Sequence, residues 1–172
     1  MTSNRTWRGA TLAAILAADV VLVLVVGATL PPFIPFAVGV LAVATPLGLL
    51  RPGGWGALAL VLCQVLCVAV PGGTPESVLD WTLAAASAAA VVVTHLALSL
   101  RASWPQRTDL PRETVFRWAR HAAYLVWVGI AAAAVGAVAT LTPMALAPWL
   151  GALALLLVGA LIWQVRGATR RA

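Results

Sequence analysis

The chain has 172 residues, of which 62% are hydrophobic and only 9% are charged, and its formal net charge is +6. Soluble globular proteins carry about 25% charged residues, so this composition leaves too little polar surface to cover a water-soluble core. All 11 basic residues are arginines at the ends of hydrophobic segments, which favours a membrane topology over a nucleic-acid partner. The arginine bias, with abundant Ala, Gly, Val and Pro, is typical of a GC-rich bacterial genome.

Six apolar segments match the length needed to cross a bilayer core of about 30 Å. They span residues 9–30, 33–50, 55–70, 78–100, 116–141 and 144–165. Proline and glycine mark the breaks between them, as turns require. The short third segment can cross with little tilt or with local thinning of the bilayer. The sequence therefore predicts an all-α, polytopic membrane helical bundle with six transmembrane helices. It forms a single transmembrane domain over residues 1–172, with one substantial loop at about residues 101–115.

The arginines alternate between the two sides of this predicted bundle. They precede the first segment, lie between the second and third, cluster between the fourth and fifth, and follow the sixth. The three intervening connections contain no arginine. Because basic residues favour the cytoplasmic side of a membrane, the N-terminus, the C-terminus and every arginine are predicted to be cytoplasmic. Most tryptophans fall near segment ends, as their preference for the membrane interface predicts.

Asp19 lies near the middle of the first predicted segment, close to the bilayer midplane. Insertion scales assign a cost of about 2.5–3.5 kcal/mol to an aspartate at that depth. Such a residue usually faces the bundle interior, where it is paired or neutralised. We interpret it either as a carboxyl group that couples protons or cations, or as a hydrogen-bonded residue that fixes helix packing or contacts a partner subunit.

Three further polar residues form, with Asp19, a candidate intramembrane polar network. Gln64 lies near the middle of the third segment, and Ser87 lies at a similar depth in the fourth. His95 lies nearer the cytoplasmic end of the fourth segment, where it is placed either to pass protons to Asp19 or to donate to a backbone carbonyl. Interhelical hydrogen bonds contribute on the order of 1 kcal/mol in membranes, so a purely structural network is the alternative for all three.

Basic side chains at the start of the fifth segment predict contacts with anionic lipid headgroups: Arg112, Arg117, Arg120 and His121. The two cysteines are four residues apart on one helix face, which favours small apolar packing over a thiol-redox motif. The two histidines lie on different segments, so the sequence predicts no metal site and no cofactor. It also lacks phosphate-binding loops and nucleophile motifs, and we predict no catalytic residue.

Three functions are compatible with these features. A non-catalytic accessory or scaffold subunit of a bacterial cell-envelope complex agrees best with the few polar residues in the spans. A small proton- or cation-coupled transporter or channel would instead use Asp19. A membrane enzyme acting on lipid needs a polar cluster at one membrane face, which only the region 112–121 approximates. We expect a multi-pass protein of the bacterial plasma membrane whose partners are the lipid bilayer, other membrane subunits or further copies of itself.

Overall fold

The computed structural model of the chain describes residues 4–69, 75–104 and 110–141, and the elements of these residues are helices. They are α1 (Asn4–Thr29), the short 3-10 helix η1 (Pro31–Phe33), α2 (Ile34–Leu50), α3 (Trp55–Ala69), α4 (Val78–Ser103) and α5 (Arg112–Leu141). The first five predicted segments each correspond to one of the five α-helices. The sixth predicted segment, 144–165, lies outside the described residues.

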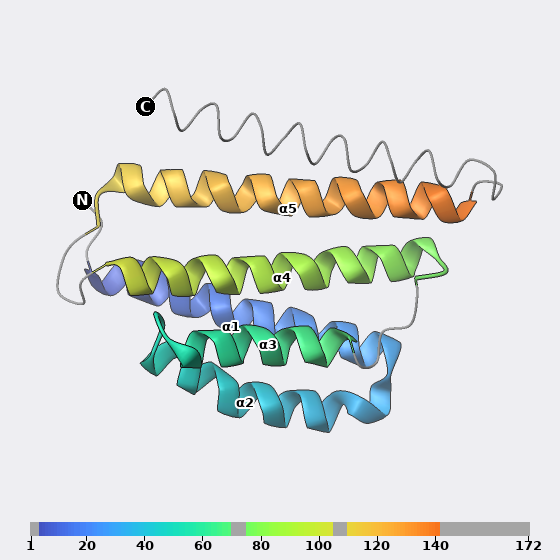
Figure 1. Cartoon of the computed structure of the whole chain (residues 1–172), viewed down its shortest axis with the longest axis horizontal. Helices are drawn as coiled ribbons and strands as arrows, with labels where there is room; N and C mark the ends of the chain where they lie inside the picture. The colour runs from blue at the N-terminus through green and yellow to red at the C-terminus, as the bar shows by residue number, and fades with distance from the viewer. Residues whose placement is uncertain (1–3, 70–74, 105–109, 142–172) are drawn as a thin grey trace.

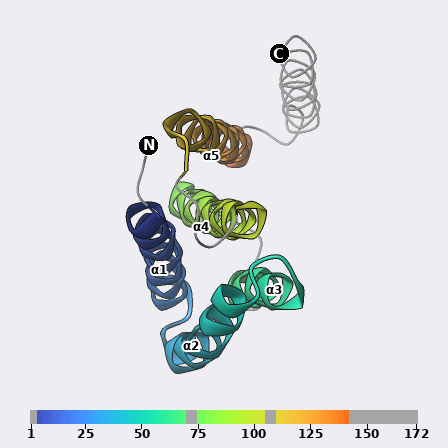
Figure 2. The ribbon, with the colours of Figure 1, turned by 90° about the vertical axis from the view of Figure 1, so that its left-hand side faces the viewer.

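The five α-helices run side by side along the long axis of the molecule, and consecutive helices point in opposite directions (Figure 1). Seen from one end, α1, α2, α3 and α4 surround a common centre, and α5 lies outside this group against α4 (Figure 2). The most extensive packing joins α1 to α4, α2 to α3, and α4 to α5. We call the group α1–α4 the four-helix core, because its interior holds the buried polar residues described below.

Arginine side chains gather at one end of the bundle. Arg8 lies near the start of α1, Arg51 directly follows α2, Arg101 lies near the end of α4, and Arg112 begins α5. Because consecutive helices are antiparallel, these positions share one end, on the left in Figure 1, which we call the arginine end. Asp80 lies in the first turn of α4, at the opposite end. The alternation of arginines along the sequence predicts this separation of charge.

Among the described residues, four helical stretches are long and apolar enough to cross a membrane: Thr6–Thr29, Pro31–Leu50, Val78–Ser103 and Arg112–Thr140. Helix α3 is also apolar, but its 15 residues rise only about 22 Å. Large apolar side chains such as Leu24 and Trp127 are exposed on the outside of the bundle, where lipid would solvate them. These features support an all-α membrane protein.

Helices α4 and α5 extend beyond the predicted spans, so the connection between them is shorter than the predicted loop at 101–115. Helix α4 continues to Ser103, and α5 begins at Arg112 after a turn in which the Pro111 carbonyl accepts from the N–H of Val115. Hydropathy identifies only the part of a helix that lies in hydrocarbon. Arginine and alanine are good helix formers, so a helix that contains them can continue into the headgroup region.

Glycines allow close packing at two helix contacts. A Cβ atom at Gly56 of α3 would collide with the backbone carbonyl oxygen of Leu47 in α2. A Cβ atom at Gly136 of α5 would lie 2.6 Å from the indole ring of Trp81 in α4. Gly129, two turns earlier in α5, has no described atom within 4 Å of the same position. Small residues thus bring helices together at Gly56 and Gly136, in line with their general use in membrane helix packing.

Candidate functional site

Asp19 is buried in α1, and both of its carboxylate oxygens accept hydrogen bonds from other helices. Thr45 Oγ1 of α2 donates to Oδ2 over 2.6 Å, and Gln64 Nε2 of α3 donates to Oδ1 over 2.7 Å. Hydrogen bonds to a carboxylate are shorter and stronger than those between neutral groups. The side chain that costs most to place in a membrane therefore ties α1 to two other helices.

Gln64 links Asp19 to the fourth helix of the core. Its side chain is fully buried, and its Nε2 also donates to Thr94 Oγ1 of α4 over 3.0 Å. Both hydrogens of the amide nitrogen are thereby used, whereas Oε1 has no hydrogen-bond partner within the described part of the chain. Asp19, Thr45, Gln64 and Thr94 form one connected network with one residue from each core helix. We call these four residues the polar layer.

Buried residues of small or apolar type enclose the polar layer on both sides. On each core helix they lie one turn before and one turn after the polar-layer residue: Ile15 and Leu22 on α1, Leu41 and Gly48 on α2, Leu60 and Cys67 on α3, and Ala90 and Leu98 on α4. This spacing of three or four residues follows the helical repeat. The low dielectric of such surroundings strengthens the hydrogen bonds, and it raises the free-energy cost of any buried polar group that lacks a hydrogen-bond partner.

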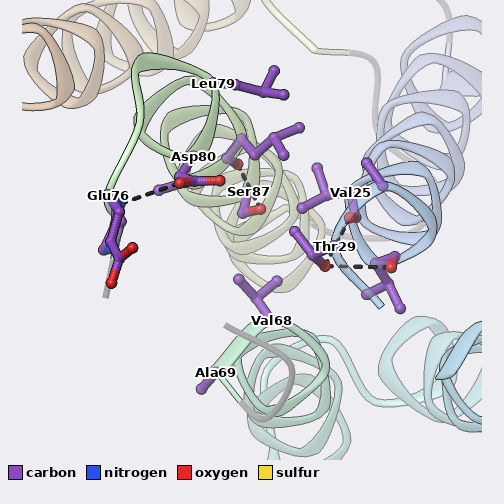
Figure 3. Close-up of a pocket in the computed structure, with 13 residues that line it drawn as sticks. Val25, Thr29, Val68, Ala69, Glu76, Leu79, Asp80 and Ser87 are labelled. Carbon is purple, nitrogen blue, oxygen red and sulfur yellow. Dashed lines mark hydrogen bonds between the residues drawn. The ribbon is translucent and has the colours of Figure 1, made fainter. Parts of the chain in front are cut away.

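A cavity of about 660 Å³ lies between α1, α3 and α4 at the end opposite the arginine end (Figure 3). Its lining is mostly valine, leucine and alanine, with Thr29, Glu76 and Asp80 among them. Ser87 also lines this cavity, and its hydroxyl donates to the carbonyl of Leu83 in its own helix over 2.8 Å. Ser87 therefore does not join Asp19 in the network that the sequence suggested.

A second cavity, of about 480 Å³, lies at the arginine end between α3 and α4. His95 lines it, together with Ser99 one turn further along α4. Successive residues point about 100° apart around a helix, so Thr94 faces the core while the side chain of His95 is exposed. His95 is therefore separated from Asp19, which lines neither of the two cavities.

The structure thus joins two of the four residues that were expected to share a network, Asp19 and Gln64, and places Ser87 and His95 elsewhere. Thr45 and Thr94 complete the network instead. In the sequence, Thr45 and Thr94 could have been found as polar residues that lie at the same membrane depth as Asp19 in neighbouring spans. Threonine gives a weak signal, because its hydroxyl can equally bond to the backbone of its own helix.

The basic residues at the start of α5 are exposed at the arginine end: Arg112, Arg117, Arg120 and His121. His121 Nδ1 lies 2.7 Å from the carbonyl oxygen of Arg117, one turn earlier. Cys63 and Cys67 are free thiols. Within the part of the chain that the structure describes, no three side chains of the metal-binding types come together.

Comparisons of the chain with protein-family models, with curated proteins and with solved structures returned no match. The described residues define the class: they form helices, and four of these helical stretches are long and apolar enough to span a membrane. Its distinctive internal feature is the polar layer, in which one side chain from each helix of the four-helix core is hydrogen-bonded.

Proposed function

We propose that this chain is a non-catalytic membrane protein that serves as an accessory or scaffold subunit of a bacterial cell-envelope assembly. In this proposal it crosses the plasma membrane six times, with both termini and the arginine end in the cytoplasm, as the positive-inside distribution of arginines favours. The supporting observation is how Asp19 is used. Both carboxylate oxygens are engaged by other helices, and the residue lines neither cavity.

A coupling carboxyl group must exchange its proton or cation with water on each side of the membrane in turn. Asp19 instead contacts Thr45 and Gln64, and buried residues such as Ile15 and Leu22 lie one turn away on its own helix. This arrangement supports a packing role, in which the interior polar groups fix how the helices pair. The outer surfaces of the bundle then remain for lipid and for other subunits.

Reconstitution into sealed vesicles tests this proposal against transport. We expect the purified chain to carry no proton, Na⁺ or K⁺ flux above that of empty vesicles, as measured with an internal pH-sensitive dye and with cation-selective dyes under an imposed gradient. The physical reason is that Asp19 is buried and lines neither of the two described cavities. A flux that disappears in Asp19→Asn would contradict the scaffold proposal and assign transport to Asp19.

The assembly state tests the scaffold role directly. Extraction with a membrane-solubilising polymer keeps native lipid and partners around the protein, and mass measurement then gives the composition. We expect the chain in a complex with a second component at fixed stoichiometry. Recovery of the lone chain, folded and without any such component, would contradict the role of accessory subunit.

A small proton- or cation-coupled transporter is the second candidate, and one observation favours it. The two cavities lie toward opposite ends of the bundle with the polar layer between them, and Gln64 Oε1 is left without a partner inside that layer. A rearrangement that joined either cavity to Asp19 would expose the carboxylate to water. The flux measurement on Asp19→Asn discriminates between the two candidates.

A further inference from the structure

The arginine end holds a second cluster of polar groups, formed by the start of α1 and the end of α4. Arg101 Nη2 donates to the backbone carbonyl of Arg8 over 3.3 Å, so the guanidinium of Arg101 lies against the backbone of α1. Arg8 and Arg101 are both cationic, and like charges on neighbouring groups repel each other. The Arg8 guanidinium carbon lies 5.5 Å from the centre of the Trp7 ring, and Trp104 packs beside the apolar cluster to which Trp7 belongs. We call Trp7, Arg8, Arg101 and Trp104 the cationic cluster.

Four N–H donors of the cationic cluster are buried without a hydrogen-bond partner among the described residues: Nε of Arg8, Nε of Arg101, and the indole Nε1 of Trp7 and of Trp104. Trp7 is only 3% exposed. Buried polar and charged groups in proteins are normally paired, and each exception calls for an explanation. Here every unmet group is a donor, and two of them belong to cations. The complementary ligand is therefore an anion with several acceptor oxygens.

We propose that the cationic cluster binds the phosphate group of an anionic phospholipid. The guanidinium fork matches the geometry of phosphate oxygens, and basic pockets between membrane helices bind lipid headgroups. Arg8 and Arg101 lie near the ends of the candidate spans Thr6–Thr29 and Val78–Ser103, which is the depth of the headgroups. Tryptophan is enriched at the same depth. A lipid phosphate placed there offsets the repulsion between the two arginines.

The cationic cluster differs from the exposed arginines of α5 in its burial. The proposal that it binds a lipid phosphate does not depend on the proposed scaffold function. The α5 side chains form a solvated basic surface, where attraction to lipid is general and screened by salt. The cationic cluster is partly buried between α1 and α4, beside the apolar residues Leu100 and Leu110. Screening is weaker in such a place, so a bound headgroup is expected to be retained through purification.

Titration of the purified full-length chain in detergent micelles with phosphatidylglycerol, followed by native mass spectrometry, tests the proposal. We expect Arg8→Gln/Arg101→Gln to weaken phosphatidylglycerol binding about tenfold or more. The matched control Arg112→Gln/Arg117→Gln removes the same charge from the exposed face of α5, and it is expected to leave the affinity nearly unchanged. Equal weakening in both double variants would show general charge attraction and would overturn the site.

Two further measurements separate the sources of the phosphate and guard against loss of fold. Inorganic phosphate at millimolar concentration is expected not to displace phosphatidylglycerol, and displacement would overturn the assignment to lipid. If the double glutamine variant does not fold, Arg101→Lys keeps the charge and removes the planar fork of donors. We expect this variant to fold, by circular dichroism, and to bind phosphatidylglycerol more weakly than the natural chain. An unchanged affinity would overturn the proposal.

Discussion

Replacement of Gln64 by leucine is expected to lower the free energy of unfolding by about 2–3 kcal/mol. The leucine removes the amide that donates to Asp19 and Thr94, and it leaves a buried carboxylate with Thr45 as its remaining partner in the polar layer. An unmet charged acceptor in a low-dielectric interior costs more than an ordinary hydrogen bond contributes. Reversible unfolding in mixed SDS and detergent micelles, followed by far-UV circular dichroism, measures the change.

A double-mutant cycle shows whether this effect passes through Asp19. We expect Asp19→Leu/Gln64→Leu to be more stable than Gln64→Leu alone by about 1 kcal/mol or more, because the unmet carboxylate has gone. Ser87→Ala is the matched control. Its hydroxyl is also buried but bonds within its own helix, so a change of less than about 0.5 kcal/mol is expected. Strict additivity of the two leucine substitutions would contradict a direct link between Asp19 and Gln64.

The second large effect is expected at Gly56. Gly56→Ala should lower the free energy of unfolding by about 3 kcal/mol, because the added methyl group meets the backbone carbonyl of Leu47 and forces α2 and α3 apart. A backbone atom cannot turn away as a flexible side chain can. The same micelle titration measures the loss.

Gly39→Ala is the matched control for this prediction. Gly39 lies in α2, and nothing described lies within 4 Å of its Cβ position. The substitution is expected to be neutral or to stabilise by up to about 1 kcal/mol through helix propensity. If Gly56→Ala proves as mild as Gly39→Ala, the close contact between α2 and α3 is wrong.

Helix positions could be predicted from the sequence because hydropathy alone decides where a helix can enter hydrocarbon. The predicted segments 33–50 and 55–70 agree with α2 and α3 to within a residue. The C-terminal end of α4 and the start of α5 lie three and four residues outside the predicted segments 78–100 and 116–141, since arginine-rich turns continue a helix beyond its apolar part. Capping and packing, which hydropathy does not measure, decide those ends.

The pairing of Asp19 with Gln64 follows from depth, because both lie near the middle of their spans and neither can be left alone in hydrocarbon. The choice between Thr94 and His95 does not follow from depth. These neighbours differ by one position on a helix that is apolar on most of its surface, so the pattern of polar residues cannot fix which face points inward. Only the packing of α4 against α1 and α3 selects Thr94.

We infer that the polar layer is closed to water and holds the four core helices together. The reactivity of Cys67, one turn from Gln64 and almost completely buried, tests it most directly. In a Cys63→Ala protein in lipid nanodiscs, Cys67 is the remaining thiol, and a membrane-impermeant maleimide reaches both faces. As a positive control, Ser99→Cys in a Cys63→Ala/Cys67→Ala background places a thiol in the cavity at the arginine end. We predict complete labelling of the Ser99→Cys protein while Cys67 stays unlabelled. Labelling of Cys67 at a comparable rate would place water at the polar layer and contradict its packing role.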